Sequence, residues 1–187
     1  NLDGPAGGEE AFPYRLVLEK TGNQPAGAGP FKFGEKYKVV FQASGEALKQ
    51  AEEKGGVAKR YVYVFMIDST GEAKCFFPEP ANGNEGNLIP RGNTPEPHIE
   101  ATRNEYDVQI SEPAGTDNYF MVASREPIDP GIFQWSGVRE APAACRGAGS
   151  PLELMFSSVG EGTRGARAEH NVPVNWSIQS MPIRSVP

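Results

Sequence analysis

The sequence predicts a mainly β protein, an Ig-like β-sandwich with one or two short helices. Segments of strand length recur along the 187-residue chain, with apolar residues that alternate with polar ones or form a short run. Turn-forming Gly, Pro, Asn and Asp residues separate these segments. No long amphipathic helix is present in the pattern. Recurrent strands without such helices are typical of a sandwich.

Two early segments alternate as half-buried strands do. Residues 12–20 direct Tyr14, Leu16 and Leu18 to one face, and Arg15 and Glu19 to the other. In residues 31–44, the predicted inward residues are Tyr37, Val39 and Phe41, and the outward residues are Lys36, Lys38 and Gln42. We therefore expect both segments to cover one side of a core.

Residues 61–78 predict a β-hairpin. Seven consecutive apolar or aromatic residues, 61–67, have the length of a strand and leave no polar face, so we expect a central strand covered on both sides. Asp68 and Gly71 bound a turn, and residues 73–77 form the returning strand.

Further strands are predicted at residues 98–101, 118–124 and 172–184, the last with Val174, Trp176 and Ile178 on one face. In residues 105–111, Tyr106, Val108 and Ile110 are expected to point inward, and Asp107 and Gln109 outward. Ile132, Phe133 and Trp135 are expected to anchor the Pro/Gly-rich segment that follows.

Two short helices complete the prediction. Residues 46–54 are good helix formers with little to bury, and we interpret them as an exposed insertion. Ser150, Pro151 and Glu153 have the spacing of a helix start, and Gly160 follows as a stop. Residues 1–11 are polar and Gly-rich, so we expect a flexible tail followed by a single domain over 12–187, with a C-terminal extension at 129–187.

Composition excludes some classes of function. Hydrophobic residues make up 38% of the chain, which also has 22 glycines and 17 prolines, so a core with much loop is expected. The net charge of −6 argues against nucleic-acid binding, which needs a basic surface. No apolar run approaches the ~18–20 residues of a membrane span, so membrane insertion is not expected. Residues 1–10 have no signal-peptide pattern, and we expect none there.

A cysteine-nucleophile motif is the strongest catalytic candidate. The residues around Cys145, Ala143-Ala-Cys-Arg-Gly147, resemble the Q-A-C-[RQG]-G signature of caspases, and His98 lies 47 residues upstream. Charge and proline interrupt the segment before Cys145, and Pro97 and Ile99 flank His98 where a small-residue turn is needed. We therefore expect a loop cysteine, with its sulfur more than ~6 Å from the His98 ring, too far for direct proton transfer.

Other motifs have ordinary structural explanations. Gly160, Gly162 and Gly165 match the dinucleotide fingerprint, but no strand precedes them and no amphipathic helix follows. Two His and two Cys form no zinc-ligand pattern, and a Cys75–Cys145 disulfide stays open. Asp68, Asp107 and Asp117 fit solvated faces or turn caps. Trp135 and Trp176 are core aromatics or platforms for a sugar or peptide. We predict no catalytic, cofactor or metal residues.

Four elements in order carry a family resemblance. They are the 61–78 hairpin with Asp-x-x-Gly and the ending Phe77-Pro78, Asn87-Leu88 after it, Phe33-Gly-Glu-Lys-Tyr37 before it, and the segment 113–124 with Pro127. Together, over about residues 30–128, they resemble a bacterial family known as domain of unknown function 4384. The 46–54 helix departs from the family's simpler hairpin.

The resemblance implies an accessory role. Such domains are appended to caspase-like peptidases, protein kinases or envelope proteins and have no known active site. We therefore expect a non-catalytic accessory or interaction domain of a bacterial protein, with an extracytoplasmic location favoured. Its partner would be another protein or an adjacent domain of the same polypeptide, without a cofactor. The alternatives are a caspase-like cysteine hydrolase that uses Cys145 and His98, and a carbohydrate-binding module that uses exposed aromatics.

Overall fold

The computed structural model describes residues 2–3, 12–20, 24–25, 30–68, 71–79, 83–92, 94–134 and 176–187. Strands dominate these residues, with one α-helix and one short 3-10 helix among them. In chain order the elements are β1 (Leu2–Asp3), β2 (Arg15–Lys20), β3 (Gln24–Pro25), β4 (Phe31–Lys32), β5 (Lys36–Gln42), α1 (Gly45–Glu53), β6 (Arg60–Ile67), β7 (Ala73–Phe77), β8 (Leu88–Ile89), β9 (His98–Glu100), β10 (Val108–Gln109), β11 (Thr116–Ser124), η2 (Pro130–Phe133) and β12 (Trp176–Val186).

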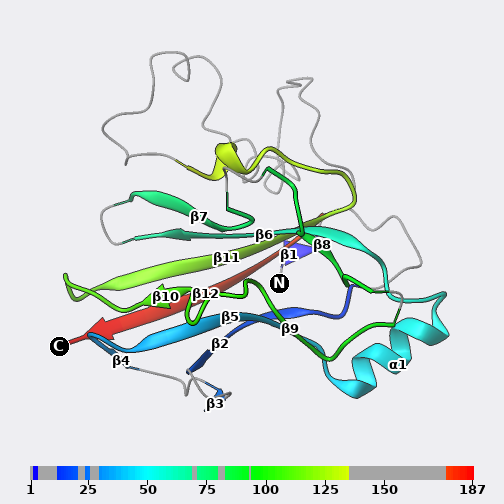
Figure 1. Cartoon of the computed structure of the whole chain (residues 1–187), viewed down its shortest axis with the longest axis horizontal. Helices are drawn as coiled ribbons and strands as arrows, with labels where there is room; N and C mark the ends of the chain where they lie inside the picture. Colours follow the sequence, from blue (N-terminus) through cyan, green and yellow to red (C-terminus); the bar gives the residue numbers. More distant parts are fainter. Residues whose placement is uncertain are drawn as a thin grey trace, which may run out of the picture.

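Two packed sheets form the predicted β-sandwich (Figure 1). The larger sheet has the order β1-β12-β11-β6-β7, with β4 beside β12 and β8 beside β6. The smaller sheet has the order β10-β5-β2-β3, with β9 beside β5. All pairings are antiparallel except that of β12 with β4. The mainly β prediction is confirmed.

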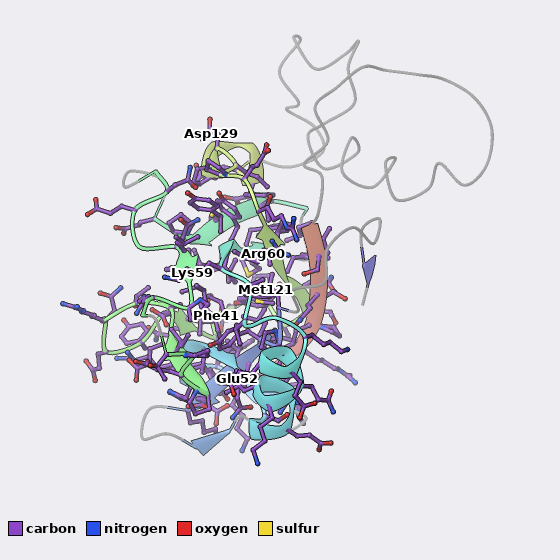
Figure 2. All side chains as sticks on the ribbon, turned by 90° about the vertical axis from the view of Figure 1, so that its right-hand side faces the viewer. Phe41, Glu52, Lys59, Arg60, Met121 and Asp129 are labelled. Carbon is purple, nitrogen blue, oxygen red and sulfur yellow. The ribbon has the colours of Figure 1, made fainter. Side chains whose placement is uncertain are left out.

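The main core fills the space between the sheets. The predicted inward residues of β2 and β5, including Leu18, Val39 and Phe41, are buried there against Val64 and Met121 of the larger sheet. Figure 2 shows the labelled Phe41 and Met121 in this layer. The period-two pattern of the sequence therefore identified the correct faces of both strands.

The β6 strand is central, as its apolar run predicts. It pairs with β11 on one side, and with β7 and β8 on the other. Val62 and Val64 face the main core, whereas Tyr63 and Phe65 belong to a second cluster on the opposite face of the sheet. Phe133 of η2, a predicted anchor, stacks on Phe65 with ring centroids 4.7 Å apart. The strand is thus covered on both faces.

Glu19 corrects the predicted alternation of the second strand. It was expected to point to solvent, but only 5% of its surface is exposed. Its carboxylate lies 3.0 Å from Nε2 of His98 on β9, which packs beside β5 next to β2. A polar partner from another strand therefore allows this carboxylate to lie inside the protein.

The helix α1 confirms the predicted helix and packs more closely than expected. Ser44 caps it, because the Ser44 hydroxyl accepts a hydrogen bond from the Ala47 amide at 3.1 Å. Ala51 is buried, and the partly buried Leu48 packs against the main core. The helix is therefore attached to the sandwich along one narrow stripe.

Other boundaries differ from the predictions. Only Val108–Gln109 of the predicted 105–111 strand pair with β5, although Val108 and Ile110 are buried as expected. Leu2 and Asp3, inside the predicted tail, pair with β12. The predicted helix that starts at Ser150 lies outside the described residues. Among the described helices, none has the length and hydropathy that crossing a membrane requires.

Candidate functional site

A groove of about 740 Å³ is the candidate functional site. One wall is formed by Cys75, Phe76 and Phe77 of β7 with the Pro78 and Glu79 that follow. The other wall is the loop 101–107 between β9 and β10, and residues 85, 86 and 91 close the groove between them. β7 is the last strand of the larger sheet, and β10 is the last strand of the smaller one. The groove therefore lies at an open edge of the sandwich.

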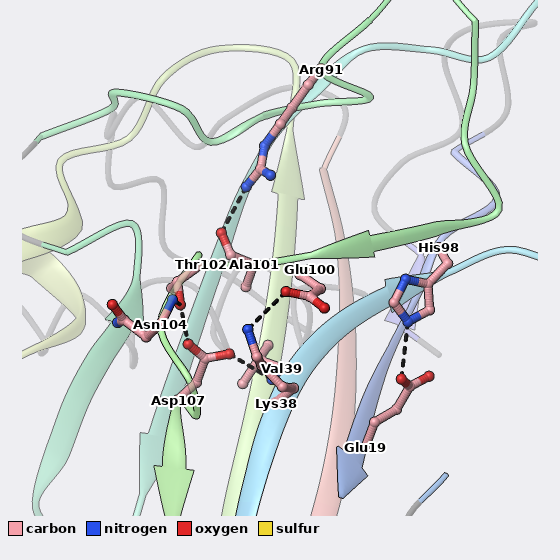
Figure 3. A network of polar contacts seen from close by, with 10 residues as sticks. All are labelled: Glu19, Lys38, Val39, Arg91, His98, Glu100, Ala101, Thr102, Asn104 and Asp107. Carbon is pink, nitrogen blue, oxygen red and sulfur yellow. Dashed lines mark hydrogen bonds and ion pairs between the residues drawn. The ribbon is translucent and has the colours of Figure 1, made fainter. Parts of the chain in front are cut away.

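Asp107 holds the 101–107 loop in one shape (Figure 3). One carboxylate oxygen accepts a hydrogen bond from the Val39 amide on β5 at 2.8 Å, and the other accepts one from the Thr102 hydroxyl. The Thr102 oxygen accepts in turn from the Asn104 amide at 3.1 Å. Asp107 was expected on a solvated face, but its half-buried carboxylate instead connects this loop to the sheet. These hydrogen bonds consequently hold the loop in position as one wall of the groove.

Two arginines face the groove from this side. Arg91 donates from Nη2 to the Ala101 carbonyl at 2.7 Å, which fixes the position of its guanidinium (Figure 3). Arg103 is exposed at the tip of the loop. Tyr106, further along the loop, has the Lys36 ammonium 4.2 Å from its ring centroid. These groups make the wall cationic and rich in hydrogen-bond donors.

The opposite wall contains a buried cysteine, Cys75. Cys75 is free and buried, and its thiol donates to the carbonyls of Phe77 and Pro78 at 3.6 and 3.5 Å. Burial raises the pKa of the Cys75 thiol to about 12, which favours its protonated form at neutral pH. Glu79, which follows β7, and Glu85 are exposed and also line the groove. The groove can thus bind a ligand through charge and hydrogen bonds.

His98 lies outside the groove. It is half-buried on β9, and its Nε2 contacts Glu19 as described above. On the same small sheet, Lys38 pairs with Glu100 at 2.7 Å (Figure 3). The smaller sheet therefore holds two separate polar contacts between neighbouring strands, His98 with Glu19 and Lys38 with Glu100.

Several predicted candidates lie outside the described residues. These are Cys145 with its caspase-like flanks, the glycines 160, 162 and 165, and Trp135. Trp176 begins β12, but its side chain also falls outside the description. The Cys145–His98 separation therefore remains a prediction. The Cys75–Cys145 disulfide, which the sequence left open, is not formed, because Cys75 is a free cysteine.

The remaining acidic candidates are structural. Asp68 accepts the Glu72 amide at 2.9 Å and caps the hairpin turn, as predicted. Asp117 lies on β11 opposite Ile183, where its charge adds to the burial that raises the pKa of Tyr119. Over the described residues, no group of three or more His, Cys, Asp or Glu side chains is arranged to hold a metal ion.

Sequence reasoning did not select Arg91, Arg103 or Tyr106 as site residues. The only local signal was the run of polar residues at 102–105 between two predicted strands, because exposed polar loops often carry binding residues. Their approach to the end of β7 depends on the packing of the two sheets.

Comparison with known proteins agrees with the resemblance seen in the sequence. Residues 50–127 match the family model described as Domain of unknown function (DUF4384). The match includes the 61–78 hairpin, Asn87-Leu88 and the 113–124 segment, whereas the element at residues 33–37 lies before it. No curated protein and no solved structure matches the chain.

Every described residue that lines the groove falls between Cys75 and Asp107, within the matched segment. As far as the described residues define it, the groove is therefore a feature of the matched part. Over residues 50–127, the chain is similar to the DUF4384 family.

Proposed function

We propose that this chain is a non-catalytic interaction domain whose groove holds a segment of a partner protein or of an adjacent domain. The observation that carries the proposal is the contrast between the two walls. One wall presents the guanidinium groups of Arg91 and Arg103 at a loop that Asp107 connects to the sheet, and the other presents β7 with a protonated, buried thiol. Such an arrangement favours recognition over bond-breaking chemistry.

The open and mostly polar shape of the groove supports a polypeptide ligand. A volume of about 740 Å³ is within the ~300–1,000 Å³ of small-ligand sites, but this groove is open at the edge of the sandwich and mostly polar. A polar, open site accommodates part of a longer chain, whose ends continue into solvent.

The cysteine-hydrolase alternative needs His98 as a base for Cys145. In the described structure, the Nε2 atom of His98 contacts Glu19 and the ring does not line the groove, so no imidazole is among the described residues that line it. The carbohydrate alternative needs exposed aromatic rings, and Tyr106 is only half-exposed and covered by Lys36. Both observations favour binding of a protein segment in the groove.

Selection from a random twelve-residue peptide library tests the proposal. Asn104→Trp fills the groove from the loop tip without removing the Asn104 amide that contacts Thr102. Glu52→Trp is the matched control, because Glu52 is exposed on α1 (Figure 2) and does not line the groove. We expect selected peptides to bind the wild type and Glu52→Trp equally, and to bind Asn104→Trp at least about tenfold more weakly.

A fluorogenic peptidase screen completes the test. We expect no turnover. Turnover that Cys145→Ala abolishes would overturn the proposal in favour of the hydrolase. Selection that yields only peptides indifferent to Asn104→Trp would overturn the assignment of binding to the groove.

A further inference from the structure

We propose that the groove takes an acidic peptide segment in extended conformation, which pairs with the free edge of β7 and places a carboxylate at Arg91 and Arg103. This inference rests on the proposed function and specifies its ligand. It follows from three features of the groove: the edge of β7, the state of the two arginines, and the position of Glu79.

The first feature is the edge of β7. In the described part of the chain, β7 pairs only with β6. At the hairpin turn, the Asp68 amide donates to the Glu72 carbonyl at 3.0 Å, so this pair is hydrogen-bonded. Bonded and non-bonded pairs alternate along an antiparallel ladder. The backbone N–H and C=O groups of Ala73 and Cys75 are therefore directed away from β6, toward the edge.

An extended peptide is the ligand that satisfies such groups. A strand added to a sheet edge gains main-chain hydrogen bonds, while its alternate side chains contact the neighbouring surface. Here that surface is the groove, since Cys75 itself and the half-buried Phe76 line it. Phe76 is held by stacking on Tyr119, with ring centroids 5.7 Å apart. β7 thus supplies both the pairing edge and an apolar contact.

The second feature is the state of the two arginines. Arg91 uses Nη2 for the Ala101 carbonyl, which orients the guanidinium and leaves its other N–H groups for a ligand. Asp107 accepts hydrogen bonds from Val39 and Thr102, and among the described residues it forms no ion pair with either arginine. A fixed guanidinium binds a carboxylate through paired, charge-assisted hydrogen bonds.

The third feature is the position of Glu79, which follows β7 directly and lines the groove at that wall. Its charge disfavours a ligand carboxylate near that wall, and directs it across the groove to Arg91 and Arg103. The pattern of charges therefore selects a peptide with acidic side chains on the face that meets the 101–107 loop.

Fluorescence anisotropy with three labelled peptides tests this inference. The probes are the eight-residue repeats (Thr-Glu)4, (Thr-Gln)4 and (Thr-Lys)4, which share strand propensity and differ in charge. We expect (Thr-Glu)4 to bind at least about tenfold more tightly than the other two, and more weakly as salt is added. Equal binding of (Thr-Gln)4 would overturn the requirement for a carboxylate.

Charge reversal locates the contact. Arg103→Glu should weaken (Thr-Glu)4 at least about tenfold and improve (Thr-Lys)4. Arg125→Glu is the matched control, because Arg125 is exposed and does not line the groove, and it should leave both affinities unchanged. An equal effect of the two substitutions would reduce the preference to net charge and overturn the site.

Hydrogen exchange tests the pairing with β7. Binding of (Thr-Glu)4 should slow exchange of the Ala73 and Cys75 amides, and unchanged exchange there would overturn strand addition. Library-selected peptides without acidic residues that still depend on Asn104 would overturn this inference and leave the proposed function intact. The absence of any groove-dependent peptide would overturn both.

Discussion

Substitution of Val64 tests the central position of β6. Val64 is fully buried in the main core, opposite Met121 on β11 and Phe77 on β7. Val64→Ala removes two carbons, worth ~0.8 kcal/mol each, and leaves a small cavity, so we expect a loss of about 2–3 kcal/mol in the free energy of unfolding. Val64→Asp keeps the size and places an unpaired carboxylate in the core, which costs several kcal/mol more.

Urea denaturation followed by circular dichroism measures these losses. A domain of this size has a total stability of roughly 5–15 kcal/mol, so Val64→Asp should be unfolded or insoluble at neutral pH, whereas Val64→Ala should fold with a lower midpoint. Lys59→Asp is the control, because Lys59 is exposed just before β6 and should tolerate the same carboxylate. A cooperative transition of Val64→Asp at the wild-type midpoint would refute the burial argument.

Three further predictions concern the periphery of the sandwich. Hydrogen bonds from Lys20, Tyr37 and the Lys32 amide lower the pKa of Glu35 to about 2, so Glu35 stabilises the fold above its ordinary pKa near 4.5, and this contribution is lost as pH falls from 4.5 toward 2. The stability difference between wild type and Glu35→Gln, up to about 1 kcal/mol near pH 6, should therefore vanish near pH 2 in pH-dependent melts; a constant difference would contradict the assignment. His98→Ala leaves the buried Glu19 carboxylate without this partner and should cost about 1–3 kcal/mol, much of which Glu19→Gln should restore in a double-mutant cycle; an additive cycle would mean that the pair is not coupled. Replacement of residues 45–56 by a short Gly-rich turn should cost about 2 kcal/mol in urea denaturation through the loss of Leu48 and Ala51 packing, and an unchanged midpoint would restore the view of α1 as a loose insertion.

Local sequence patterns predicted the long strands of the sandwich because these strands are amphipathic or wholly apolar over five or more residues. The alternation in β5 and the apolar run in β6 each specify which residues are buried before any long-range contact is known. The same rule failed at Glu19. Alternation predicts that the residue after buried Leu18 is exposed, but both residues are buried. Its burial depends on His98, 79 residues away, and no periodicity carries that information.

The groove could not be predicted from the sequence. Its walls come from β7 and from the 101–107 loop, which meet only because the two sheets end at the same open edge. Asp107 and Gln109 alternate with buried residues and are equivalent in the sequence pattern. In the structure, Gln109 is exposed on β10, whereas Asp107 turns back to the Val39 amide.

This difference at Asp107 has a consequence for binding. Among the described residues, no ion pair joins Asp107 to Arg91 or Arg103. Its carboxylate instead accepts hydrogen bonds from the Val39 amide and the Thr102 hydroxyl, which connect the loop to the sheet and leave both guanidinium groups available to a ligand. One residue that sequence analysis assigned to an ordinary exposed face therefore determines the shape of this wall of the groove.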